Sequence, residues 1–203
     1  MFTIFLVSVI VISLSGVMMP GPLFAMTVAK SYNNSTSGAL VALGHAVIEI
    51  PLIFLIYFGF ANFLKLTELQ IFIGVAGGAI LIYMGMDMIR SRKAMVEEGK
   101  DLPYGSFTGG IITTAVNPYF LLWWASVGAA LIVKSIAFGL MGFVLFTVIH
   151  WLCDFVWLSG MSLVIHRLHH SWSKRVHRAI FSLCGLLMVG FGVWFIGSVI
   201  IKL

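Results

Sequence analysis

Two short polar motifs occur inside otherwise apolar sequence, and each places an acid four residues after a histidine. His45 precedes Glu49, and His150 precedes Asp154. Residues four positions apart share one face of a helix, so each histidine can contact its acid. Imidazole and carboxylate groups exchange protons, and together they suit transition metals. The two pairs are therefore candidate sites for proton transfer, substrate binding or metal ligation.

The composition around these pairs is that of a membrane protein. Hydrophobic residues make up 61% of the 203-residue chain and charged residues 9%, whereas soluble domains contain roughly 45–50% and about 25%. A charged side chain at mid-bilayer costs roughly 2.5–3.5 kcal/mol, so such residues usually mark pathways for ions or substrates. A water-soluble domain is excluded. A structural role for the pairs, as hydrogen-bonded clamps between helices, stays open.

Six apolar segments are long enough to cross a bilayer, which takes about 20 helical residues. They cover residues 2–28, 36–63, 69–89, 107–132, 136–165 and 179–201. We expect a single transmembrane domain over residues 1–203, all-α in class. The sequence contains no nucleophile–base motif, Walker loop or dinucleotide fingerprint, so we expect neither an enzyme nor a cofactor.

Basic residues between these segments predict the orientation in the membrane. Nine belong to the first, third and fifth loops: Lys30, Arg90, Arg92, Lys93, Lys100, Arg167, Lys174, Arg175 and Arg178. Three belong to the opposite side: Lys65, Lys134 and Lys202. Basic residues concentrate on the cytoplasmic side, so both termini are expected outside. The net charge of +5 is therefore explained by basic residues that orient the protein in the lipid bilayer, its expected partner. It does not indicate binding of nucleic acid.

Polar and glycine markers recur in the same order in the two halves of the chain. The His–acid pairs are 105 positions apart, and Gly78 and Gly85 recur 107 positions later as Gly185 and Gly192. Three spans in each half place the halves in opposite orientations, an architecture of secondary transporters. The expected division is repeat one over about residues 1–89, a cytoplasmic loop over about 90–106 and repeat two over about 107–203.

The first and fourth segments each contain a helix break. Pro20, Gly21 and Pro22 interrupt the first segment, and Asn117 and Pro118 interrupt the fourth. Proline removes a backbone donor and displaces the carbonyl group four residues earlier. Non-helical backbone at membrane depth survives only against protein or a wet cavity. The paired breaks predict a substrate site between two broken helices, and two packed kinks are the alternative.

Three motifs in these segments resemble those of the lysine exporter and threonine/homoserine exporter (LysE/RhtB) family. They are Met18-Met19-Pro20-Gly21-Pro22-Leu23, Gly78-Ala79-Ile80-Leu81-Ile82-Tyr83-Met84-Gly85 and Ala115-Val116-Asn117-Pro118. The resemblance covers essentially the whole chain. It implies export of amino acids or close derivatives across the cytoplasmic membrane, driven by an ion gradient. It also places the proline, glycine and asparagine residues of both breaks in the functional core.

Residues and resemblance together predict a secondary exporter of amino acids that works by alternating access. Protons are the expected coupling ion, and His45, Glu49, His150 and Asp154 are expected to line or gate the cavity. A divalent metal cation exporter is the alternative, because two imidazoles and two carboxylates form a four-ligand set. The plasma membrane is the expected location, and the sequence leaves open whether the protein forms a homodimer.

Overall fold

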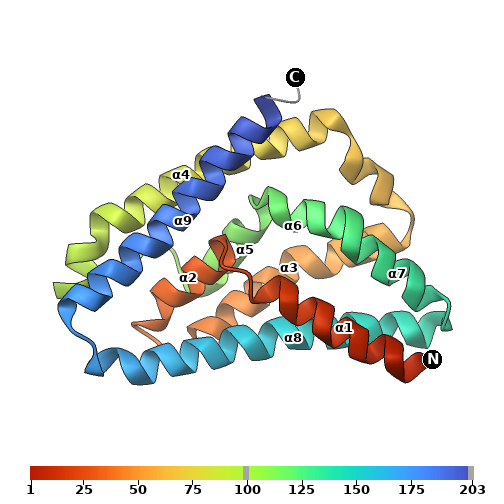
Figure 1. Ribbon diagram of the computed structural model, residues 1–203, viewed down its shortest axis with the longest axis horizontal. Coiled ribbons are helices and arrows are strands. Elements are labelled where there is room, and N and C mark those ends of the chain that lie inside the picture. Colours follow the sequence, from red (N-terminus) through yellow and green to blue (C-terminus); the bar gives the residue numbers. More distant parts are fainter. Residues whose placement is uncertain (98–100, 201–203) are drawn as a thin grey trace.

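The computed structural model describes residues 1–97 and 101–200, which form a bundle of helices (Figure 1). The elements are α1 (Phe2–Val17), α2 (Pro22–Ser31), α3 (Ser37–Tyr57), a 3-10 helix (Phe60–Lys65), α4 (Thr67–Glu97), α5 (Ser106–Ala115), α6 (Pro118–Trp123), a π-helix (Trp124–Gly128), α7 (Ala129–Ile136), α8 (Gly139–Leu168), a second 3-10 helix (His169–Ser171) and α9 (Lys174–Ile200). These residues contain no strand, so the expected all-α class is confirmed. Lys100, Lys202 and the end of the sixth predicted segment lie outside the described residues.

Five stretches among the described residues are long and apolar enough to cross a membrane. They cover Ser37–Tyr57, Thr67–Ala94, Pro118–Ile136, Gly139–Ser171 and Lys174–Ile200. A sixth span results if α1 and α2 count as one, although the two helices are bent by 73° at the break between them. The expected six spans therefore correspond to five stretches and one broken pair.

Several expected boundaries are wrong by a turn or more. α4 continues to Glu97 instead of ending near residue 89, because residues 91–97 include no proline or glycine that would stop a helix. α3 ends at Tyr57, six residues early, where Gly59 takes a φ of 97° that favours glycine. α9 begins at Lys174 and so takes up basic residues that the loop was expected to hold.

The helix ends sort to two sides of the molecule (Figure 1). The C-terminal ends of α2, α4 and α8 lie at one side, on the left of the view. The C-terminal ends of α3 and α7 lie at the other side, together with the N-terminus of the chain. Odd and even connections are therefore separated, as expected for helices that cross a layer in alternating directions.

α4 and α9 pack side by side along their length through a glycine seam, formed by Gly78, Gly85, Gly185 and Gly192 (Figure 1). A Cβ atom added to Gly85 would lie 2.5 Å from the carbonyl oxygen of Gly185. A Cβ atom added to Gly192 would lie equally close, at 2.5 Å, to the carbonyl oxygen of Gly78. Small residues let membrane helices approach at backbone distance, so these four positions determine the spacing of the pair.

Two apolar clusters pack the bundle and leave a polar centre between them. α3 contributes Val41 and Ala42 to one cluster and Leu52 and Ile53 to the other. The first cluster also holds buried residues of α2, α4 and α9, and the second holds those of α1, α6 and α7. α3 carries its His–acid pair between its two apolar stretches, so the packing places that pair at the middle of the bundle.

Lys30 is buried, although the charge count assigned it to a loop. Its side chain is 2% exposed, and its Nζ lies 3.0 Å from Asp101 Oδ1. The same ammonium group donates a hydrogen bond to the carbonyl oxygen of Leu102 at 3.1 Å. A buried charge needs such partners. The contacts of Lys30 therefore join the end of α2 to Asp101 and Leu102, in the segment that precedes α5.

Candidate functional site

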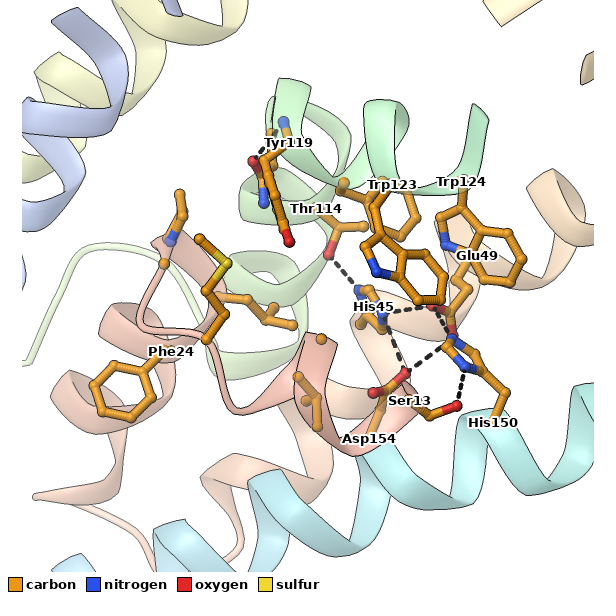
Figure 2. A pocket seen from close by; sticks show the side chains of 18 of the residues that line it. Ser13, Phe24, His45, Glu49, Thr114, Tyr119, Trp123, Trp124, His150 and Asp154 are labelled. Atoms are coloured by element: carbon orange, nitrogen blue, oxygen red, sulfur yellow. Dashed lines mark hydrogen bonds and ion pairs between the residues drawn. The ribbon is translucent and has the colours of Figure 1, made fainter. Parts of the chain in front are cut away.

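The structure brings the four ionisable residues of the two His–acid motifs together at the centre of the bundle (Figure 2). His45 and Glu49 lie on α3, and His150 and Asp154 lie on α8. Each of the four is at most 6% exposed. We call these four residues the polar quartet. Such burial is costly for ionisable groups unless they contact one another.

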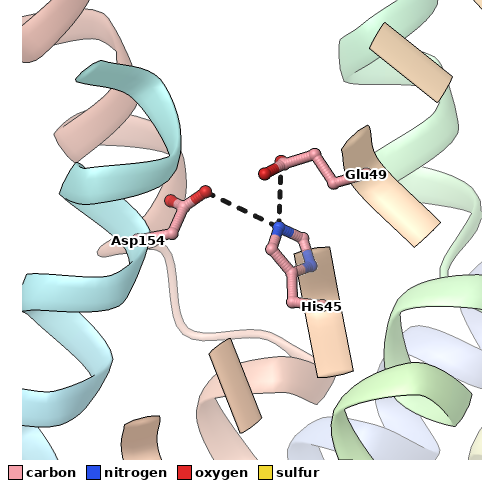
Figure 3. Close-up of side chains that lie close together, drawn as sticks. All are labelled: His45, Glu49 and Asp154. Carbon is pink, nitrogen blue, oxygen red and sulfur yellow. Dashed lines mark hydrogen bonds and ion pairs between the residues drawn. The ribbon is translucent and has the colours of Figure 1, made fainter. Parts of the chain in front are cut away.

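Each acid of the polar quartet contacts both histidines. Glu49 Oε1 lies 2.9 Å from His45 Nε2 and 3.2 Å from His150 Nε2. Asp154 Oδ2 lies 3.6 Å and 3.7 Å from the same two nitrogens. Figure 3 shows Asp154 on α8 facing His45 and Glu49 across the gap between α8 and α3. The quartet therefore joins the two helices, and neither pair is confined to its own helix.

Two hydroxyl residues, which the sequence analysis did not single out, complete the network. Thr114 Oγ1 lies 2.8 Å from His45 Nδ1, and Ser13 Oγ lies 2.7 Å from His150 Nδ1. Thr114 lies in the last turn of α5 and Ser13 belongs to α1, so each comes from a broken segment, ahead of its break. Sequence gave no distinguishing signal, because most serines and threonines in helices bond to the carbonyl group three or four residues earlier.

Both acids keep unused hydrogen-bonding capacity. Glu49 Oε2 and Asp154 Oδ2 are buried and have no hydrogen-bond partner among the described residues. Ionised carboxylates only accept hydrogen bonds, and unpartnered oxygens at such burial are unfavourable. The two atoms are therefore able to accept from a donor that enters the centre.

A cavity of about 100 Å³ adjoins the quartet and reaches both helix breaks. Gly21, Pro22 and Asn117 line it together with all four quartet residues. Pro20 does not line this cavity, and Pro118 lines a separate, smaller one against α4 and α9. The structure therefore gathers seven of the nine sequence-selected site residues around one space, and Pro20 and Pro118 are not part of its lining.

The two breaks differ in how their helix starts are satisfied. α2 begins at Pro22, after the extended residue Gly21, and no side chain caps it. α6 begins at Pro118, and Asn117 Oδ1 accepts a hydrogen bond from the backbone N–H of Tyr119 at 3.1 Å. Proline suits the first position of a helix, where its missing N–H is not needed. The backbone N–H groups at the start of α2 are therefore left for other acceptors.

Aromatic rings enclose the imidazoles. The indole of Trp123 stacks over the His150 ring with centroids 5.5 Å apart, and the ring of Phe120 meets His45 edge-on at 5.3 Å. Trp124, which is fully buried, also contacts His150 edge-on. In Figure 2 the indoles of Trp123 and Trp124 cover the quartet on one side, and Phe24 lies at the opposite end of the cavity. The rings restrict the imidazoles to small movements.

Apolar spans that surround a cavity lined by four buried ionisable residues define an integral membrane protein whose polar groups face its own interior. The chain belongs to the LysE type translocator family, whose model matches residues 14–198, a range that includes both breaks and the whole quartet. The resemblance found in the sequence is thereby confirmed. The protein is a multi-pass transporter of the cell membrane, and its family is one of translocators and not of enzymes.

A similar protein is known from Bacillus subtilis (strain 168), under the name "Putative amino acid efflux protein YcgF". It is 22% identical to the chain over 194 residues, and the alignment covers 93% of each protein. No solved structure matches the chain.

Proposed function

We propose that the protein exports amino acids across the cell membrane by alternating access, driven by the proton gradient. The observation that carries the proposal is the cavity where the two broken segments meet the polar quartet. Secondary transporters commonly bind substrate between discontinuous helices near the bilayer midplane. The name of the Bacillus relative, an amino acid efflux protein, supports an amino acid as cargo.

The amino group of the substrate would bind the two acids. Glu49 Oε2 and Asp154 Oδ2 lack hydrogen-bond partners among the described residues and belong to side chains that line the cavity. An ammonium group has three donors and no acceptor, so it complements two unpartnered carboxylate oxygens. Hydrogen bonds between charged groups are roughly twice as strong as neutral ones.

The carboxylate of the substrate would bind at the start of α2. This helix has no side-chain cap, and its first residues Pro22, Leu23 and Phe24 line the cavity. Helix starts carry partial positive charge and free N–H groups, which attract anions. No lysine or arginine lines the cavity in the described part of the chain, so the positive potential for an anion there comes from the start of α2 and from the imidazoles of the quartet when these are protonated.

The rest of the lining favours an apolar substrate side chain of medium size. Val17, Phe24, Tyr119 and Phe191 contribute rings and aliphatic groups to the wall. A cavity of about 100 Å³ has room for roughly seven to ten water-sized atoms, at about 10–15 Å³ each. Leucine and methionine fall in this range, and the wall offers no second charged group for a lysine or glutamate side chain.

We propose further that the chain is an inverted repeat with both termini outside the cell. A shift of 107 positions turns the contact between Gly78 and Gly192 into the contact between Gly185 and Gly85. The polar centre has the same reciprocity, because each histidine meets a hydroxyl group from a broken segment of the other half. Repeat one (about 1–89) would rock against repeat two (about 107–203), and the concentration of basic residues puts the odd loops in the cytoplasm.

Protonation of the quartet would couple to export. Two acids and two histidines lie within contact of one another and of the cavity, so a proton bound there changes the charge that the substrate meets.

The divalent-metal alternative uses the same atoms, since His45, Glu49 and Asp154 each offer one ligand atom within 4.8 Å of the others. The family match gives no support to that alternative, and the test below includes it as an outcome.

The test is transport by the purified protein in liposomes, with and without a pH gradient. Labelled leucine should move in the presence of the gradient, faster than lysine or glutamate. Asp154→Asn and Glu49→Gln should lower the rate by more than about tenfold, because removing one partner of a buried charge pair costs about 2–5 kcal/mol.

Asp87→Asn is the matched control, since Asp87 lies on α4 and does not line the cavity. Its rate should stay near that of the unaltered protein. Failure of every amino acid to move, together with divalent-cation transport that Glu49→Gln abolishes, would replace this proposal with the metal alternative.

A further inference from the structure

The two histidines of the polar quartet differ in the freedom of the hydroxyl group at Nδ1. Thr114 Oγ1 lies 2.7 Å from the carbonyl oxygen of Gly110, which can only accept. The single hydroxyl proton of Thr114 is therefore directed to Gly110, and the Thr114 oxygen accepts from His45 Nδ1 at 2.8 Å. This arrangement requires a proton on His45 Nδ1.

Ser13 leaves His150 a choice. Its hydroxyl group lies 2.7 Å from His150 Nδ1 and makes no second hydrogen bond within residues 1–97 and 101–200. It can donate to a bare Nδ1 or accept from a protonated one. On the same helix, Ser8 and Ser15 donate to the carbonyl group three residues earlier. When the Ser13 hydroxyl turns away from His150, its proton can likewise be donated to a backbone carbonyl group in the preceding turn of α1.

We propose that His150 takes up and releases the coupling proton, and that Ser13 and Thr114 are positioning residues that make the two histidines unequal. That the His150 proton drives transport rests on the proposed function. That the two histidines differ in how they bind protons rests on their hydrogen bonds alone. In neutral His150, Ser13 donates to Nδ1, and the proton on Nε2 faces Glu49 Oε1 at 3.2 Å. An incoming proton binds the lone pair of Nδ1, and the Ser13 hydroxyl rotates to accept from it. Release reverses both steps, and no other covalent bond changes.

His45 does not have this option. Loss of the proton from Nδ1 would place a nitrogen lone pair against the Thr114 oxygen, whose own proton is held by Gly110. On the other side of the ring, Nε2 lies 2.9 Å from Glu49 Oε1, a distance that requires one shared proton between the two atoms. His45 and Glu49 therefore together keep two protons, one on His45 Nδ1 and one shared between His45 Nε2 and Glu49 Oε1.

The groups that face His150 limit the alternatives. They are Glu49 and His45 from α3, Asp154 from α8, Ser13 from α1, and the uncharged rings of Trp123, Trp124 and Phe146. All the titratable members belong to the quartet. A proton that enters from the cavity is therefore exchanged with the quartet and not with a distant group.

Nitrogen NMR of histidine-labelled protein in detergent tests the inequality directly, with His45→Gln and His150→Gln to assign the signals. Over the pH range in which the protein stays folded, His150 should titrate while Nδ1 of His45 stays protonated. Thr114→Val should release this constraint on His45. Thr113→Val is the control, because the Thr113 hydroxyl donates to the neighbouring carbonyl of Gly109 and contacts no histidine. A His45 that titrates in this range, or a His150 that does not, would overturn the proposal.

Transport in liposomes tests the coupling. Ser13→Ala should move the midpoint of the pH–rate profile to lower pH by about half a unit to one unit, because protonated His150 loses a charge-assisted hydrogen bond and the neutral ring a weaker one. Ser13→Thr should restore the midpoint, and Ser15→Ala should not change it. Thr114→Val should lower the rate without moving the midpoint; the opposite pattern would reverse the assignment. If the unaltered protein moves no amino acid, the proposed function fails, and the NMR result still decides the inequality.

Discussion

The glycine seam and the polar quartet both join helices from the two halves of the chain, but they do so by opposite means. In the seam, backbones of α4 and α9 approach so closely that a Cβ atom at Gly85 would lie 2.5 Å from a carbonyl oxygen. In the quartet, long polar side chains of α3 and α8 meet at 3.2–3.6 Å. The seam is made of the smallest residues, and the quartet is made of residues that a bilayer penalises.

The difference separates stability from chemistry. Close packing of glycines needs no polar group and supplies van der Waals contact along the whole pair. The quartet buries four ionisable groups and leaves Glu49 Oε2 and Asp154 Oδ2 without hydrogen-bond partners in the described structure, which lowers stability. We infer that the seam holds the bundle together and that the quartet is retained for transport. Damage to the seam should therefore reduce folding, and damage near the quartet should reduce export.

The largest effect on stability is expected at the seam. Gly192→Ala places a Cβ atom 2.5 Å from the carbonyl oxygen of Gly78, and overpacking of this kind costs about 1–3 kcal/mol. Gly190→Ala, two residues earlier on α9, meets nothing within 4 Å and should be neutral or stabilising by up to about 1 kcal/mol. Unfolding in detergent measures both. Equal behaviour of the two variants would show that α4 and α9 are not in backbone contact.

A smaller effect is expected at the second break, which lies between the two regions. Asn117→Ala removes the acceptor for the Tyr119 N–H and should cost about 1 kcal/mol of stability. Because α6 starts at the cavity, export should fall as well. Asn117→Ser supplies another cap and should retain most of the stability. A fully stable, fully active Asn117→Ala protein would make this break a packed kink without a role.

Much of the fold was available from patterns in the sequence. Apolar runs of sufficient length predicted the helical class and, with α1 and α2 counted as one broken pair, six spans. Proline beside glycine or asparagine predicted both breaks, at Pro22 and Pro118. Pro51 alone does not end a helix, since it lies inside α3. The exact helix ends were less accessible. Arg90 and its charged neighbours were expected to leave the helix, but a charged residue that leaves the bilayer still favours helical backbone.

The sequence by itself determined which residues are too polar for lipid and must face inward: His45, Glu49, His150 and Asp154. Local spacing could pair each histidine with the acid on its own helix, since that contact depends only on helical geometry. Only the tertiary structure decided that Glu49 bridges both histidines and that Ser13 and Thr114 fix their outer nitrogens. These contacts join residues about 70 to 140 positions apart, and their directions depend on how α1 and α5 pack against α8 and α3.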